Sequence, residues 1–119
     1  MTDLSSELPG LESIRARFVS LLEERQIHIA EHALAAWDSE NSDQQANHLK
    51  EAQNVLHQIS GTAGSLGFDT LGHAARACEG SIISYLEVAD AEKMPLPHAL
   101  LVEIDTFVAL SQSLLSKSS

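Results

Sequence analysis

The chain has 119 residues, a formal net charge of −10, 44% hydrophobic residues and 20% charged residues. This length suits one compact domain, and the composition is that of a folded protein rather than a disordered chain. The acidity argues against nucleic-acid binding, because the 7 Lys and Arg residues are scattered and form no basic patch. One cysteine, Cys78, cannot build a disulfide framework or a thiolate zinc cluster.

No secretory signal is expected at the beginning of the chain. Residues 1–10 lack the basic and apolar regions of a secretory signal, and no run approaches the roughly 18 apolar residues of a membrane span. We therefore expect a cytoplasmic protein without membrane insertion. The segment Leu8-Pro9-Gly10 is expected to end a mobile N-terminal tail of residues 1–10, which leaves residues 11–119 as a single helical domain.

Apolar residues recur at spacings of three and four, which predicts helices throughout. A long first helix is expected from Leu11 to about Asp38, before the break at residues 40–43. Ser42 followed by Gln45 resembles a capping box and predicts the start of a second helix, which ends near Gly67. The inward residues expected are Leu11, Ile14, Phe18, Leu22, Ile29, Ala33 and Trp37 on the first helix, and Leu49, Ala52, Leu56, Ile59, Ala63 and Leu66 on the second.

Asp69 is placed to cap a third helix that runs to about Val88, and turn signals at residues 90–97 precede a last helix from about Pro97. Four amphipathic helices joined by short loops bury their apolar faces most simply in an antiparallel bundle. The predicted fold is all-α, an up-down four-helix bundle with a long first helix. Its remaining inward residues are Leu71, Ala75, Cys78, Ile82 and Leu86 on the third helix, and Leu101, Ile104, Val108 and Leu115 on the fourth.

The segment from His57 to Phe68 departs from good helix-forming sequence. Gly61 and Gly64 lie inside the second helix, and together they weaken it by about 2 kcal/mol relative to alanine. On a helical wheel His57 falls about 140° from the centre of the apolar stripe, and both glycines fall within about 40° of His57. The sequence therefore predicts an exposed histidine beside a bare stretch of main chain.

An exposed imidazole with nothing bulky beside it suits a nucleophile that another protein must approach. Neutral imidazole is nucleophilic near physiological pH, and a phosphoryl group on its nitrogen stays reactive enough to be passed on. The alternative is a surface histidine with glycines that serve helix packing. Packing glycines should face the core, whereas the wheel places Gly61 and Gly64 outside.

These residues resemble the histidine phosphotransfer domains, whose second-helix motif reads His, two residues, Lys, Gly, with further glycines downstream. The resemblance implies a four-helix bundle, a phosphorylated His57, and docking of receiver domains on the exposed face around it. The matching positions are His57, Gly61, Gly64 and Gly67, with Leu71 and Glu79 where the family usually has an apolar and an acidic residue.

One departure from the family concerns charge. The usual lysine, three residues after the histidine, is Ser60 here, and that lysine would help to neutralise a phosphoryl group. Lys50 and Arg76 are candidate substitutes, although about 10 Å of helix separates Lys50 from His57. The alternative for Lys50 is a solvated lysine, and for Arg76 a surface ion pair.

Two functions remain open from the sequence. In the first, the chain is a phosphocarrier rather than a stand-alone enzyme: His57 relays a phosphoryl group between aspartates of receiver domains, which belong to response regulators and hybrid sensor histidine kinases. The receiver would supply Mg²⁺, and the chain would need no cofactor of its own. In the second, the bundle is a binding module that is not itself phosphorylated and that inhibits or scaffolds a receiver or kinase. Ser60 in place of the usual lysine is the feature that favours this alternative.

Other histidines suggest a third function, a metal sensor. His28 and His32 stand one turn apart, a spacing used by helical zinc sites, but no third ligand is evident, so no metal site is predicted. His48 and His73 are not expected to join a site.

Overall fold

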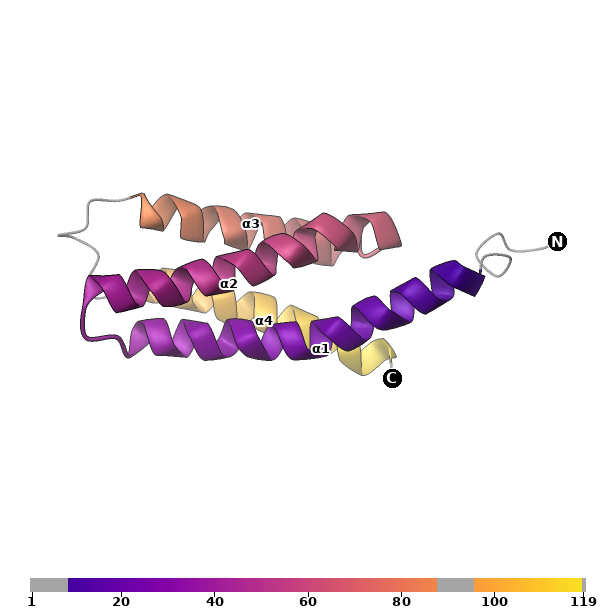
Figure 1. Cartoon of the computed structure of the whole chain (residues 1–119), viewed down its shortest axis with the longest axis horizontal. Helices are drawn as coiled ribbons and strands as arrows, with labels where there is room; N and C mark the ends of the chain where they lie inside the picture. Colours follow the sequence, from indigo (N-terminus) through magenta and orange to yellow (C-terminus); the bar gives the residue numbers. More distant parts are fainter. Residues whose placement is uncertain (1–8, 88–95, 119) are drawn as a thin grey trace.

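The computed structural model describes residues 9–87 and 96–118. These residues form four long helices that run up and down the same axis, so that helices adjacent in sequence are antiparallel (Figure 1). The predicted all-α four-helix bundle is confirmed. Its elements are α1 (Pro9–Trp37), α2 (Ser42–Ala63), the single 3-10 turn η2 (Gly64–Leu66), α3 (Asp69–Leu86) and α4 (His98–Ser118).

The first helix begins slightly earlier than expected. Pro9 and Gly10, which were assigned to a tail, form the first turn of α1. A proline is compatible with that position because the first N–H groups of a helix have no partner within it. Residues 1–8 of the expected tail lie outside the described residues, as do Val88 and most of the turn signals at residues 90–97.

The start of α2 corrects the predicted capping box. The cap is Asn41, whose side-chain oxygen accepts a hydrogen bond from the backbone N–H of Gln44 at 2.9 Å. Gln45 is buried instead, and its Oε1 accepts a hydrogen bond from the hydroxyl of Tyr85 at 2.8 Å. The predicted helix start was correct within a residue, but the residue assigned to close the cap tethers α2 to α3.

The turn between α2 and α3 ends the glycine-rich segment. Gly67 has a φ of 89°, in the left-handed region that favours glycine. The backbone N–H of Phe68 donates to the carbonyl of Ala63 at 2.8 Å, and that of Gly67 to the carbonyl of Gly64 at 3.2 Å, which is the Schellman pattern. The prediction that Asp69 caps α3 is wrong, because Asp69 is the first residue of α3 and Phe68 occupies the cap position without a side-chain hydrogen bond.

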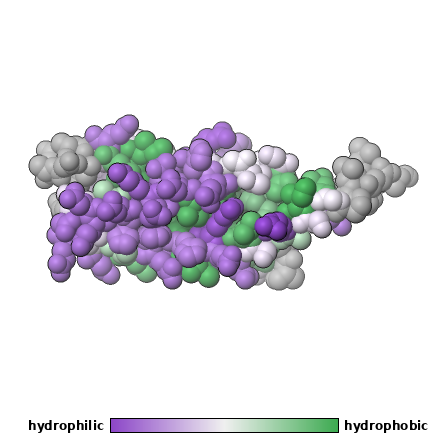
Figure 2. Space-filling view, viewed as in Figure 1, coloured by the Kyte–Doolittle hydropathy of each residue, from purple (hydrophilic) through white to green (hydrophobic). Residues whose placement is uncertain are grey.

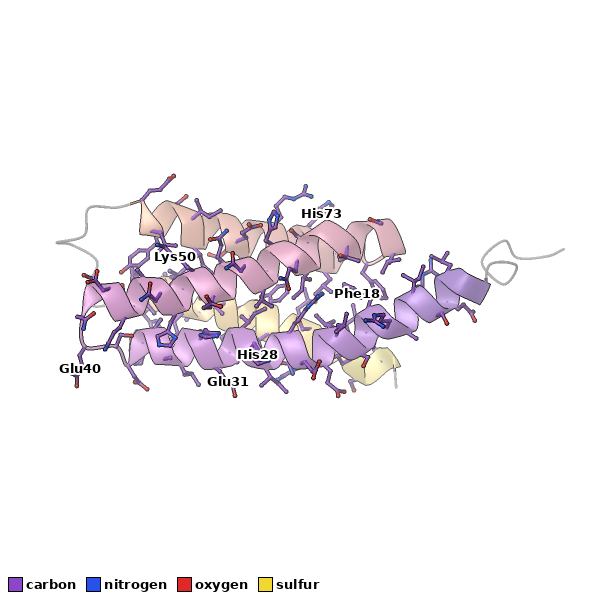
Figure 3. All side chains as sticks on the ribbon, viewed as in Figure 1. Phe18, His28, Glu31, Glu40, Lys50 and His73 are labelled. Carbon is purple, nitrogen blue, oxygen red and sulfur yellow. The ribbon has the colours of Figure 1, made fainter. Side chains whose placement is uncertain are left out.

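The arginine and aromatic residues of α1 hold this turn against the bundle. The Nε of Arg15 donates to the carbonyl of Leu66 at 3.0 Å, which satisfies an acceptor at the end of η2. Phe18, seen at the bundle interior in Figure 3, stacks on Phe68 with ring centroids 5.1 Å apart. The end of the segment that carries His57 is therefore anchored to the first helix.

The core is the shared apolar stripe of all four helices. Every inward residue predicted for α2 is buried. On α1 the predictions for Ile14 and Trp37 are wrong, since they are 53% and 44% exposed. Successive steps of four residues drift around the helix by about 40° each, so Ala36 takes the buried place expected for Trp37. Trp37 instead packs edge-on against His98 at the start of α4, with ring centroids 6.2 Å apart.

The last helix packs mainly against α1, and its contact with α3 is less extensive. Ile104 and Val108 are buried as predicted, and Leu101 and Leu115 are half-buried and pack against the core. Leu100 and Phe107 are also buried in the core. By length and composition, residues 98–117 are apolar enough to cross a membrane, contrary to the expectation from the sequence. Helices in the core of a bundle meet the same criterion. Figure 2 shows a broad face that is mainly hydrophilic.

Candidate functional site

His57 lies on the C-terminal half of α2 and faces solvent. Its side chain is 73% exposed, while its neighbours Leu56 and Ile59 on the helix are fully buried. The imidazole therefore stands on the face of α2 opposite the core, as the helical wheel predicted.

The two glycines that follow His57 leave the main chain bare. Gly61 and Gly64 are exposed, and a Cβ atom added at either position would meet nothing within 4 Å. Neither glycine is needed for helix packing, which is the alternative that the sequence left open. Gly72 on α3 faces the helix interface instead, where an added Cβ would lie in van der Waals contact with the backbone nitrogen of Gly64 at 3.4 Å. The sequence analysis did not single out Gly72.

Glu79 on α3 contacts the imidazole from the inner side. Its carboxylate Oε2 lies 2.9 Å from His57 Nδ1, and the Glu79 side chain is only 11% exposed. In the sequence, Glu79 stood out only as the acidic residue of the family pattern, with no contact assigned to it. Only the packing of α3 on α2 shows that this carboxylate meets His57.

This contact determines which imidazole nitrogen is available. An ionised carboxylate only accepts hydrogen bonds, so His57 Nδ1 carries the proton and donates it to Glu79. The other nitrogen, Nε2, then holds the free lone pair of the neutral ring. The site presents a nucleophilic nitrogen to solvent and keeps the proton on the protein side.

A second donor reaches the same carboxylate oxygen. Gln53 lies one turn before His57 on α2, and its Nε2 donates to Glu79 Oε2 at 3.3 Å. Gln53 was not among the site residues predicted from the sequence. The signal available was its spacing of four residues from His57, which places both side chains on one face of the helix.

Ser60 does not present its hydroxyl to the solvent side of His57. Its Oγ donates to the backbone carbonyl of His57 at 3.0 Å, so the hydroxyl proton is used within the helix. Ser60 thus offers neither charge nor a free donor in this arrangement.

Arg76 and Lys50 differ in their position relative to the histidine. Glu79 on α3 faces His57 on α2, and Gly72 on α3 faces Gly64 on α2. Because the two helices are antiparallel, Arg76 on α3 lies opposite the stretch of α2 between His57 and Gly64, on the glycine side of His57. Lys50, labelled in Figure 3, lies two turns before His57 on α2. Both side chains are exposed, and neither forms an ion pair with any described residue.

The remaining histidines form a different contact from the one considered on sequence. His32 on α1 meets His48 on α2, with their Nδ1 atoms 3.1 Å apart. The ring centroids are 5.3 Å apart, which is the distance between the two nitrogens plus about one ring radius on each side. The two nitrogens therefore point at each other, as in a hydrogen bond in which one nitrogen donates and the other accepts. His28 instead lies 3.6 Å from Glu31 (Figure 3).

No metal site is visible in the described part of the chain, where no three metal-binding side chains come together. His73 is exposed on α3. His48 was not expected to join a site, and its hydrogen bond to His32 is a contact between α1 and α2 that the sequence did not predict.

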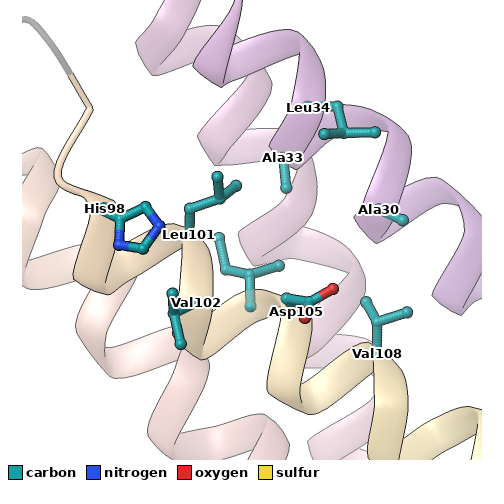
Figure 4. Close-up of a pocket in the computed structure, with 9 residues that line it drawn as sticks. Ala30, Ala33, Leu34, His98, Leu101, Val102, Asp105 and Val108 are labelled. Carbon is teal, nitrogen blue, oxygen red and sulfur yellow. The ribbon is translucent and has the colours of Figure 1, made fainter.

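A cavity and a thiol lie away from the histidine. The cavity, about 280 Å³ in volume, lies between α1 and α4 with Leu34, Leu101 and Val102 in its lining (Figure 4). No residue of α2 or α3 lines it, so it is separate from the His57 surface. Cys78 is buried in the core, and burial together with the charge of Glu103 raises its pKa to about 12. It behaves as a small apolar residue, as expected.

Comparisons with known proteins agree with this geometry. The family model for the Hpt domain matches residues 13–113, which span all four helices and include His57 and Glu79. No curated protein and no solved structure matches the chain. An exposed histidine on the second helix of a four-helix bundle and a family match across most of the length lead to one conclusion: the chain belongs to the Hpt domain family, the histidine phosphotransfer modules of phosphorelays.

Proposed function

We propose that this protein relays a phosphoryl group between aspartates of receiver domains through His57. The observation that carries the proposal is the pairing of an exposed imidazole with a nearly buried carboxylate at 2.9 Å, which leaves Nε2 free for attack. The bare main chain at Gly61 and Gly64 gives a docking protein access to that nitrogen.

The transfer step needs no proton movement. The Nε2 lone pair of His57 attacks the phosphorus of an aspartyl phosphate, the bond from phosphorus to the aspartate oxygen breaks, and the aspartate leaves as a carboxylate. Because Nδ1 keeps its proton, the phosphorylated ring carries a positive charge. The Glu79 carboxylate faces that developing charge and stabilises it. The reverse sequence passes the group to the aspartate of an acceptor receiver.

Because Ser60 carries no charge, the positive charge that neutralises the phosphoryl oxygens must come from other side chains. Arg76 is exposed, unpaired among the described residues, and on the side where the glycines open the surface, so we assign it the role of the missing lysine. Lys50 lies two turns before His57 on α2, on the side away from the glycines. We therefore assign it only a role in attracting the receiver electrostatically. The partner receiver is expected to bring Mg²⁺, and this chain contributes no cofactor.

The test is transfer from a phosphorylated receiver domain to the purified protein. We expect an acid-labile, base-stable phosphate on the wild type, absent from His57→Gln and retained by His73→Gln, which removes another exposed histidine. Transfer onward to a second receiver would establish a relay. Label that remains in His57→Gln would refute the assignment of His57.

A second candidate is a binding module that docks on a receiver or kinase without accepting phosphate. The specific observation in its favour is Ser60, which replaces the usual lysine and uses its hydroxyl within the helix. A receiver that binds the wild type and His57→Gln equally, with no label transferred to either, would favour this function. In both cases we propose that the protein acts in the cytoplasm, where the receiver domains of a phosphorelay would meet it.

A further inference from the structure

The carboxylate that orients His57 is itself held by a second hydrogen bond. Glu79 Oε2 accepts from His57 Nδ1 at 2.9 Å and from Gln53 Nε2 at 3.3 Å. The two donors lie one turn apart on α2, and both reach across the helix interface to the same oxygen. Since the acceptor is a carboxylate, the Gln53 amide must present its nitrogen rather than its oxygen.

Glu79 needs such a donor because it is withdrawn from water. Its side chain is 11% exposed, and no Lys or Arg among residues 9–87 and 96–118 forms an ion pair with it. A carboxylate in this position is stable only when hydrogen bonds replace its lost hydration. The only other donor to this carboxylate among the described residues, His57, has a side chain that is 73% exposed, so Gln53 supplies the hydrogen bond from the more buried side of the contact.

We propose that Gln53 is a positioning residue for phosphoryl transfer, which holds the Glu79 carboxylate where it keeps the His57 proton on Nδ1 and the Nε2 lone pair outward. The proposal rests on the proposed function of His57 and assigns a residue to that reaction. Gln53 touches neither the phosphoryl group nor the reacting nitrogen, so it acts only through Glu79.

The neutral amide suits this role better than a charged side chain. A lysine or arginine at position 53 would pair with Glu79 and compete with the positive ring that forms on phosphorylation. A carboxylate there would repel Glu79 or compete for the His57 proton. An amide donates one hydrogen bond and leaves the negative charge of Glu79 for the imidazole.

The experiment compares the full-length wild type with Gln53→Met, which keeps a similar side-chain length but cannot donate. The matched control is Gln44→Met, because Gln44 is an exposed glutamine in the first turn of α2. The ¹⁵N shifts of the His57 ring report which nitrogen carries the proton, and transfer from a phosphorylated receiver gives the rate. We expect Gln53→Met to shift the ring toward the Nε2–H form and to slow transfer about 2- to 10-fold. Gln44→Met should change neither.

A double-mutant cycle separates positioning from general stability. If Gln53 acts through Glu79, adding Gln53→Met to Glu79→Ala should change the rate by less than about 2-fold. An undiminished effect in that background, or a wild-type ring tautomer in Gln53→Met, would overturn the proposal. The tautomer is measured without any receiver, so a wild type that accepts no phosphate refutes the proposed function while the Gln53 contact is still tested.

Discussion

If His57 accepts a phosphoryl group as proposed, we expect its hydrogen bond to Glu79 to contribute to the transfer rate, and Glu79→Gln tests this. This substitution removes the negative charge and keeps the size of the side chain. A hydrogen bond to a charged group contributes about 1.5–3 kcal/mol when both partners are desolvated. Here the Glu79 side chain is 11% exposed but that of His57 is 73% exposed, so water screens the pair from one side.

We therefore expect the charge of Glu79 to contribute about 1 kcal/mol to the transition state, which corresponds to an approximately 5-fold slower transfer in Glu79→Gln. The phosphorylated form should also lose stability relative to the phosphorylated receiver, because the positive ring has lost its counter-charge. Both effects have the same sign, since the ring charge develops during attack and persists in the product.

The assay is rapid mixing of a phosphorylated receiver with excess protein, so that a single transfer is followed. Glu24→Gln is the control, because it makes the same charge change at an exposed position on α1. Transfer at the wild-type rate by Glu79→Gln, with the ring proton still on Nδ1, would refute the reasoning. An equal loss in Glu24→Gln would attribute the effect to overall charge and receiver attraction instead.

Three further predictions concern the glycines, the thiol and the second histidine contact. Gly61→Ala should raise the free energy of unfolding in urea by about 1 kcal/mol, because the position is helical and an added Cβ would meet no other atom within 4 Å. Gly61→Phe should block transfer in the transfer assay without unfolding the protein. An alanine variant that is less stable than the wild type would contradict the open space at Gly61. Cys78 should resist alkylation in the native state at pH 8, and because its folded pKa of about 12 exceeds the ordinary thiol value of 9.0, stability should fall as pH rises from about 9 toward 12; rapid native alkylation would contradict its burial. His48→Phe keeps an aromatic ring but removes the nitrogen that contacts His32 Nδ1, so it should lower the free energy of unfolding by about 1 kcal/mol in urea denaturation; unchanged stability would contradict a contribution from this contact.

Helix periodicity predicted the secondary structure well because it depends on local sequence. Every inward residue assigned to α2 is buried, and His57 is exposed as the wheel required. The errors fall where periodicity has little hold. Ile14 lies in the N-terminal part of α1, which extends past the other helices (Figure 1), and Trp37 lies near the other end, where the stripe has drifted so that Ala36 is buried instead.

The predicted cap of α2 was wrong for a related reason. Asn41 and Ser42 are both good cap residues, and they stand side by side, so the sequence does not distinguish them. Which of the two residues caps the helix depends on Gln45, which is buried and accepts a hydrogen bond from the hydroxyl of Tyr85 instead of closing a capping box with Ser42. A tertiary hydrogen bond thus decided a feature that the sequence analysis treated as local.

The sequence by itself determined the helices, the all-α bundle, the exposed histidine and the bare glycine surface beside it, because each follows from the spacing of residues along one helix. The tertiary structure alone decided that Glu79 meets both His57 and Gln53 and that His32 meets His48. Contacts of this kind depend on the rotation and axial offset of one helix against another. Those are set by the packing of whole apolar faces, and no spacing within a single helix encodes them.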